Sequence, residues 1–544
     1  MAAGFRKFFL PSVLLLVVMG FSCQKNSSQA PVSASPDPAW ARASAEPKGY
    51  LEAGVAGDTL LARLYSERKW QWLLFEPPRL SPYGEIVLTT CENRFFDGMA
   101  PDGALDSLLV LWARAESLRI LAFAPDSAVS AQGDINLYRQ YYNLVGQVEV
   151  GLVHSWQKWA LDMGTPPAEL PALTARFFAD PQSATMELVP DAREYRVIRA
   201  GLAIYEYLPD WKKLSFTLKQ GEKIEPGDSG AMVVEIQERL AAEGFYAGEA
   251  TGVMDSATVA ALKEFQHYHY LEEDGVVGQS TIAVMNVPRE TLVERLSRGV
   301  LYWRTTPLLE SVRKDGWVFR VNIPEFALYV YRDGKLFSKN KVCVGSTSAD
   351  TNFTPTVHDT VEFIVINPKW NVPDRIFEDE ILEDMYDAGD ALGYLDKKKF
   401  DVAVNKKGGI TLVREPGDAN ALGRVKFLFP NRYNIYLHDT PTKSAFTKKA
   451  RSVSHGCIRL EGAIDLARTI LVTNEGWTEK GFQAAMNSGT KTGGRWVPRE
   501  VWVPLKHKIP IYVDYVLTAA DERVDRVVFF SDIYRGYGGK RRTY

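Results

Sequence analysis

Apolar residues recur at helical spacing through much of the first half of the chain. The stretch from Ile135 to Trp159 is the longest of these runs between residues 50 and 220. Farther on, Leu292, Leu296 and Val300 are four residues apart, which predicts one apolar helix face. We therefore expect a helical scaffold domain over residues 50–220, to which residues 287–312 return. Its polar residues form no cluster that suggests a catalytic site.

Residues 226–286 show a different pattern, with two helical stripes on either side of a glycine-rich turn. The pattern predicts a small domain of two amphipathic helices. The stripes consist of Val233, Ile236, Gln237 and Leu240, then of Thr258, Ala261, Leu262, Phe265 and Gln266. A metal site at His267 and His269 is disfavoured, because the neighbouring sequence offers no third or fourth ligand.

From residue 313 to the C-terminus the period shortens to two, which is typical of strands. Alternating segments begin at Val318, Ala327 and Lys341, and Asp333-Gly334 reads as a hairpin turn. Residues 509–515 and 524–530 have the composition of closing strands. A mainly-β, sandwich-like domain over residues 313–544 is therefore predicted, with Cys343 packed inside a strand pair.

The N-terminus reads as an export signal followed by a tether. Residues 1–22 combine a basic start with an apolar run too short to span a bilayer. Cys23 follows small residues, as in the lipobox of bacterial lipoproteins, where the cysteine is acylated; the alternative is an incidental cysteine near an ordinary cleavage site. Residues 23–49 are rich in Ser, Ala, Pro and Gln, which predicts a flexible tether.

Charge and cysteine content narrow the function. The 64 Lys and Arg residues against 67 Asp and Glu give a net charge of −3. No excess of positive charge therefore favours the binding of nucleic acid. Besides Cys23 the chain contains Cys91, Cys343 and Cys457. This number is odd, so a disulfide framework does not account for these cysteines.

The segment SHGCIRL, residues 454–460, gathers the groups that acyl transfer by a thiol requires. Cys457 is a candidate nucleophile, and Gly456 lets backbone amides turn towards an oxyanion. Arg459 could favour a thiolate or hold a carboxylate. The base could be the adjacent His455 or His438, which ends a predicted strand, and spacing does not decide between them.

Residues 433–467, YNIYLHDTPTKSAFTKKARSVSHGCIRLEGAIDLA, resemble the catalytic core of YkuD-type L,D-transpeptidases. The resemblance continues in NPKWNVP (367–373) and REPGDANALGRVKFLFPN (414–431). Residues 226–286 resemble a peptidoglycan-binding module. Together with the helical scaffold they are similar to the large periplasmic branch of the family, which implies a multidomain α+β fold with a helical lid inserted over 373–407.

The resemblance also implies roles for individual residues. Cys457 matches the nucleophile, His438 the general base and His455 a residue that orients the site. Backbone N–H groups at 455–457, including that of Gly456, would form the oxyanion hole. The positions implied near the substrate are Arg459, Tyr436, Trp370, Asp439 and Ser454, although a packed core residue is an alternative for Trp370.

The implied activity is peptidoglycan crosslinking. A tetrapeptide stem would be attacked, D-Ala released, and the acyl group passed to the side-chain amine of a second stem. The alternatives are an L,D-carboxypeptidase, a transpeptidase that attaches a lipoprotein, and a non-catalytic wall-binding lipoprotein. We expect glycan and stem peptides as partners, a lipid anchor in the periplasm or cell envelope, no cofactor or metal, and inhibition by β-lactams of the carbapenem class.

Overall fold

The computed structural model describes residues 47–76, 79–92, 135–404, 410–417, 420–492 and 495–535, with scattered residues between 97 and 115. The chain forms two compact units, each described by itself. One contains the chain up to Trp211 with Val287–Thr306 and Ala519–Val527. The other contains Lys212–Asn286, Pro307–Thr518 and the chain from Val528.

The first unit is mainly helical. Its longest helix, α9, presents Val153, Trp156 and Trp159 to a core in which all three are buried. The helices are α4 (Pro47–Gly54), α5 (Thr59–Glu67), α6 (Pro82–Glu92), α9 (Ile135–Asp162), α10 (Leu170–Ala179), α11 (Pro181–Glu187), α12 (Arg193–Tyr207) and α16 (Arg289–Thr305). The short strands β1 (Phe75–Glu76) and β2 (Arg79–Leu80) pair beside them.

A segment near the C-terminus also belongs to the first unit. The Arg193 guanidinium binds the Asp525 carboxylate at 3.0 Å and the carbonyl oxygens of Asp521 and Val524 at 2.8 and 3.0 Å. The sequence pattern had placed these residues in the β domain. β18 (Val527–Phe529) pairs with β17 (Thr518–Ala520) in a separate two-stranded sheet, so the prediction that 524–530 closes the main sheet was wrong.

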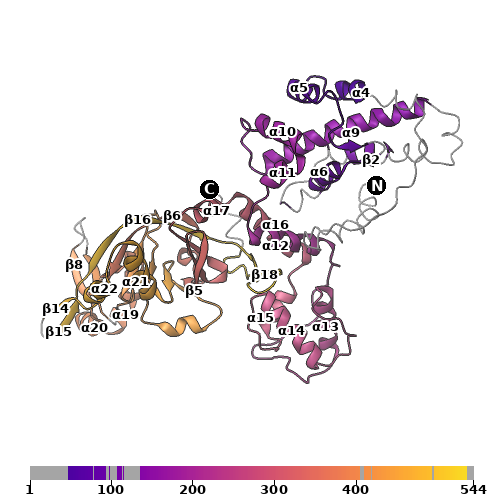
Figure 1. Cartoon of the computed structure of the whole chain (residues 1–544). Helices are drawn as coiled ribbons and strands as arrows, with labels where there is room; N and C mark the ends of the chain where they lie inside the picture. The colour runs from indigo at the N-terminus through magenta and orange to yellow at the C-terminus, as the bar shows by residue number, and fades with distance from the viewer. Residues whose placement is uncertain are drawn as a thin grey trace. The chain divides into compact units, whose positions relative to one another are not determined.

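The second unit begins with a three-helix module made of α13 (Ala231–Ala242), α14 (Ser256–Tyr268) and α15 (Gln279–Met285) (Figure 1). The predicted apolar stripes are buried on α13 and α14. Two buried glutamines fasten the turns that follow them. Gln237 accepts the Gly252 N–H at 2.8 Å, and Gln266 accepts the Gly275 N–H at 2.9 Å. Each helix thus holds its own glycine loop through one amide side chain.

The rest of the second unit is built on one nine-stranded sheet, in the order β12-β5-β13-β11-β10-β6-β16-β3-β4. Strand β5 also pairs with β4, so the sheet closes on itself. The bounds are β3 (Trp317–Asn322), β4 (Ala327–Arg332), β5 (Lys335–Gly345), β6 (Val357–Ile366), β10 (Val425–Leu428), β11 (Leu437–His438), β12 (Ser452–Ser454), β13 (Ile458–Leu460) and β16 (Val501–Asp514). The predicted fold class, multidomain with a helical region, a helical binding module and a β-rich domain, is confirmed.

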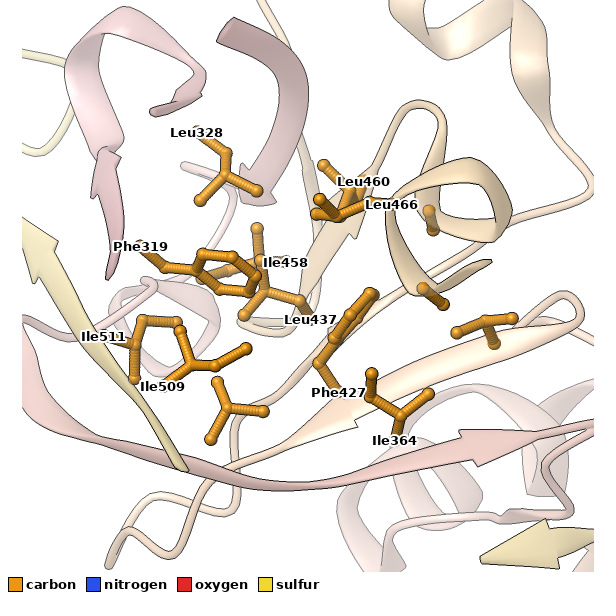
Figure 2. Packing of buried hydrophobic residues seen from close by; sticks show 14 of the residues in the cluster. Phe319, Leu328, Ile364, Phe427, Leu437, Ile458, Leu460, Leu466, Ile509 and Ile511 are labelled. Carbon is orange, nitrogen blue, oxygen red and sulfur yellow. The ribbon is translucent and has the colours of Figure 1, made fainter. Parts of the chain in front are cut away.

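The core of the sheet is made by every second residue of its strands. Figure 2 shows Phe427, Leu437 and Ile458 gathered with Phe319 and Ile364, and all five are fully buried. Helix α21 (Ala463–Asn474) and helix α22 (Glu479–Met486) contribute further apolar residues to the same core. The alternation that fills this core leaves the intervening residues on the opposite face.

An insertion leaves the sheet after β6 and returns at β10. It contains α18 (Asp374–Ile376), the π-helix η4 (Phe377–Ile381), α19 (Leu382–Asp387) and α20 (Ala391–Lys398). It also contains a three-stranded sheet of β7 (Trp370–Asn371), β9 (Ile410–Arg414) and β8 (Asp401–Val404), which the predicted helical lid did not include. Val372, Leu395 and Leu412 belong to its own small core.

Candidate active site

Two neighbouring strands bring the predicted base and the predicted nucleophile together. Strand β11 runs parallel to β13, with His438 opposite Arg459. The Ile458 N–H donates to the Tyr436 carbonyl oxygen at 3.0 Å. The pairing therefore continues one position farther, where Tyr436 lies beside Cys457. Backbone pairing alone joins these two distant parts of the sequence.

The site lies on the face of the sheet opposite the core. Leu437 and Ile458 point into the core (Figure 2), where both are fully buried. Since successive side chains of a strand alternate between faces, His438 and Cys457 point to the other side. The predicted nucleophile and the predicted base are thus diagonal neighbours on adjacent strands.

The His438 ring is buried and held in one tautomer. Its Nδ1 lies 2.5 Å from the Asp439 carbonyl oxygen. A carbonyl only accepts, so Nδ1 carries the hydrogen and Nε2 of the neutral ring is unprotonated. Burial lowers the pKa of His438 to about 4, and the charges of Arg459 and Lys426 act in the same direction. At neutral pH the ring is therefore a neutral proton acceptor.

The Cys457 thiol is also held in its neutral form. Burial raises the pKa of Cys457, while hydrogen bonding from Tyr436 and the charges of Lys426 and Arg459 oppose the rise. Among the described residues no hydrogen bond joins Sγ to the His438 ring. Such contacts often form only with substrate bound. The resting pair is a thiol and a neutral imidazole.

The turn before the nucleophile is fastened by hydroxyl groups. The Ser454 hydroxyl donates to the Cys457 carbonyl at 2.6 Å and accepts the Gly456 N–H at 3.2 Å. Gly456 has a φ of 112°, which strongly favours glycine. The Thr354 hydroxyl donates to the Gly456 carbonyl at 2.8 Å. Since the Gly456 N–H is engaged, the Cys457 N–H, without a partner among the described residues, is the better oxyanion donor.

The other residues expected at the site differ in burial and in whether their side chains are already engaged. Arg459 is partly buried beside His438, whereas His455 is exposed. Asp439 is buried and already engaged, because it accepts the Arg424 N–H at 2.9 Å and binds the Lys443 ammonium. Its carboxylate holds the turn after β11, and Ser454 likewise holds the turn before the nucleophile.

Trp370 lies in the insertion rather than on the main sheet. Its ring is 6.1 Å from that of Phe400, and the Arg414 guanidinium lies 5.6 Å from its centroid. The side chain is half-buried. Its contacts are thus typical of a core residue of the insertion, with part of the ring exposed.

Sequence reasoning did not single out Lys426 or Thr354. Lys426 alternates with the apolar residues Val425 and Phe427, a period-two signal that puts it on the face of the sheet away from the core. Its position opposite His438 follows from the pairing of β10 with β11, which no local pattern contains. Thr354 lies outside any strand, and no sequence pattern indicated a role for it.

The remaining predictions concern the N-terminal segments, metal ligands and the membrane. Cys23, the signal sequence and nearly all of the tether lie outside the described residues. Within the described ranges, no three His, Cys, Asp or Glu residues are grouped as metal ligands would be. In the same ranges, no helix has the length and apolar character needed to cross a membrane.

Comparison with known proteins assigns families to two segments. Residues 316–491 match the L,D-transpeptidase catalytic domain, YkuD, and residues 229–285 match a putative peptidoglycan binding domain. A putative L,D-transpeptidase of Haemophilus influenzae is 34% identical over 232 residues, which are 40% of this chain and 44% of that protein. The chain thus spans less than half the length of this relative.

Further similarities are shorter or weaker. A spore cortex-lytic enzyme of Oceanobacillus iheyensis is 36% identical over 80 residues, 14% of this chain and 29% of that enzyme. A solved L,D-transpeptidase structure from Stackebrandtia nassauensis matches 54% of this chain and 94% of its own, with 14% identity and a TM-score of 0.20. The chain is thus similar over residues 316–491 to the L,D-transpeptidase catalytic domain, YkuD, and over the preceding residues 229–285 to a putative peptidoglycan-binding domain.

Proposed function

We propose that this protein is a peptidoglycan L,D-transpeptidase in which Cys457 is the nucleophile and His438 the general base. The observation that carries the proposal is the pairing of β11 with β13, which sets these two side chains on one face of the sheet. The unprotonated Nε2 of His438 gives the thiol a proton acceptor. The two assigned domains support peptidoglycan as the substrate.

In the first step Nε2 of His438 removes the thiol proton as Sγ attacks the carbonyl of a tetrapeptide stem. Both groups are neutral at rest, so proton transfer accompanies attack. Positive charge from Lys426 and Arg459 favours the developing thiolate. The attacked bond joins the L-centre of the diamino acid to the terminal D-Ala.

The tetrahedral intermediate then collapses to a thioester. The Cys457 N–H is a donor for its oxyanion. The imidazolium formed at His438 returns its proton to the leaving amine, and D-Ala departs. Protonated His438 is disfavoured in this buried site, which drives the proton onto the leaving group.

In the second step the side-chain amine of a neighbouring stem attacks the thioester, and His438 accepts a proton from it. The thiolate leaves and takes this proton from His438, so the Cys457 thiol and the neutral imidazole are regenerated and two diamino acids are joined. Water would give a carboxypeptidase at the same site. The insertion supports transfer, because its ends join β6 and β10, next to His438, where it could exclude water.

Other parts of the chain bind the substrate or anchor the protein in this proposal. We propose that the helical module binds glycan, that Arg459, Tyr436 and Trp370 contact the donor stem, and that Cys23 is the lipid anchor of a protein of the periplasm or cell envelope. A carbapenem would acylate Cys457 in place of the stem.

The test is incubation of the full chain with disaccharide tetrapeptides, followed by mass spectrometry of the muropeptides. Crosslinked dimers and released D-Ala are expected, with loss of both in Cys457→Ala and His438→Gln. The buried Cys343→Ala variant is the control, because it removes a thiol from the neighbouring strand β5. Tripeptide monomers without dimers would show that the site hydrolyses the stem instead of transferring it. Unchanged dimer formation in Cys457→Ala would refute the assignment of Cys457 as the nucleophile.

A further inference from the structure

A lysine to which the proposed reaction gives only an electrostatic role lies in line with the base. Lys426 on β10 pairs with His438 on β11, which pairs with Arg459 on β13. These side chains form one row across three strands, on the face that carries Cys457. Burial lowers the pKa of His438 and raises that of Cys457, and the charge of Lys426 acts towards a lower pKa in both.

Aromatic rings hold the Lys426 side chain in this position. Its Nζ lies 5.3 Å from the ring centroid of Trp502 and 5.7 Å from that of Tyr436. Trp502 occupies the same row, since both it and Lys426 pair with Val365. Contacts with two ring faces favour a cation and restrict the side chain to the site.

The ammonium has no anionic partner there. Among the described residues, the Lys426 ammonium makes no hydrogen bond and no ion pair, although the side chain is partly buried. Burial lowers the pKa of Lys426 and the Glu500 charge opposes this lowering, but no ion pair joins the two groups in the described chain. The Arg459 guanidinium is likewise without a hydrogen bond or ion pair among the described residues. A partly desolvated cation without a counter-ion is costly, and a ligand anion would remove that cost.

The proposed donor carries such an anion at a fixed distance from the attacked bond. A tetrapeptide stem ends one residue after the scissile carbonyl, so its carboxylate lies within about one residue length, roughly 3.5 Å, of that carbon along the chain. A stem with further residues, or with a blocked C-terminus, has no carboxylate at this place. The row of cations beside Cys457 therefore distinguishes stems by where they end.

We propose that Lys426 binds the C-terminal carboxylate of the donor stem, the carboxylate of the leaving residue, and so selects stems that end one residue after the attacked bond. This inference rests on the proposed function and adds a specificity-determining residue to it. The carboxylate leaves with the released amino acid, so the contact is lost before the amine acceptor reacts. Lys426 acts on the first step alone.

Two donors and three variants test this role. The donors are a tetrapeptide stem with a free C-terminal carboxylate and the same peptide as its C-terminal carboxamide. Formation of the Cys457 thioester by the full chain is followed by rapid-quench mass spectrometry. The variants are Lys426→Met, Lys426→Arg and, as a matched control, Lys508→Met, which changes an exposed lysine of β16.

In the wild type the carboxylate donor should react roughly 10- to 100-fold faster than the carboxamide, the range expected for one hydrogen bond to a charged group. Lys426→Met should lose most of this preference, because it slows the carboxylate donor far more than the carboxamide donor. Lys426→Arg should retain part of the preference, and Lys508→Met all of it. The remaining carboxamide rate also shows that the variant folds.

A different role for Lys426 would give different results. If it acted only by stabilising the thiolate, Lys426→Met would slow both donors equally and shift the pH profile of Cys457 alkylation by iodoacetamide. That outcome, or a preference that survives in Lys426→Met, would overturn the inference while the proposed function stands. Wild-type protein that forms a thioester with neither donor would overturn both.

Discussion

The buried state of His438 predicts that acylation of Cys457 persists into acid. Burial lowers the pKa of this imidazole from 6.5 to about 4. This lowering corresponds to about 3 kcal/mol, by which the folded protein disfavours the imidazolium. Lowering the pH is the perturbation, because it tests directly whether the base stays unprotonated.

The magnitude follows from the fraction of neutral imidazole. At pH 5 a base with a pKa of about 4 is about 90% neutral, whereas an unshifted histidine is about 3% neutral. The thiol is protonated throughout this range, since burial raises the pKa of Cys457. The acylation rate at pH 5 should therefore be nearly that at pH 7, whereas with an unshifted base it would fall about 25-fold.

The assay is single-turnover acylation of Cys457 by a carbapenem between pH 4 and 8, read by intact mass. The acid limb should have its midpoint near pH 4. Stability provides a second measurement: as the pH falls from 6.5 towards 4, the unfolded chain takes up a proton that folded His438 refuses, so the free energy of unfolding falls. His438→Gln should remove this part of the pH dependence.

A midpoint at pH 6 or above would refute the reasoning. It would mean that His438 is solvated, or that a carboxylate stabilises its imidazolium. An acid limb that remains unchanged in His438→Gln would show that another group is the base. The exposed His455 is the first alternative, and His455→Gln would then move the limb.

Three further results are expected. Ser454→Ala removes the hydroxyl that bridges the turn before the nucleophile; it should slow acylation about tenfold and lower the free energy of unfolding by about 1–3 kcal/mol, and an unchanged rate would contradict this role. Leu460→Ala should lower the free energy of unfolding by about 2–5 kcal/mol in denaturant titration, against about 0.5 kcal/mol or less for exposed Leu336→Ala. Gln266→Leu leaves the Gly275 N–H without its acceptor; it should destabilise the binding module by about 1–3 kcal/mol and weaken sacculus pelleting, and unchanged pelleting would contradict it.

Local patterns predicted the elements around the site well. The period of two predicted the strands that begin at Val318, Ala327 and Lys341, and His438 was expected at the end of another strand. The motif around Cys457 was read from its residue types and its resemblance to a family. These features depend on neighbours within a few residues, so they can be recognised without a fold.

Other features depend on pairing between distant segments. The row formed by Lys426, His438 and Arg459 exists because three separate strands share one register. The low pKa of His438 arises from burial that other elements provide. The three-stranded sheet of the insertion pairs Trp370 with Arg414, more than forty positions later. No period in the sequence contains such information.

The parallel pairing of β11 with β13 also has a consequence for the timing of assembly. Parallel neighbours cannot be joined by a tight hairpin, so the chain between His438 and Ile458 must complete a crossover before they meet. Until then the thiol is an ordinary cysteine, far from its proton acceptor. In a newly made chain, Cys457 therefore has no proposed base beside it until β11 and β13 pair.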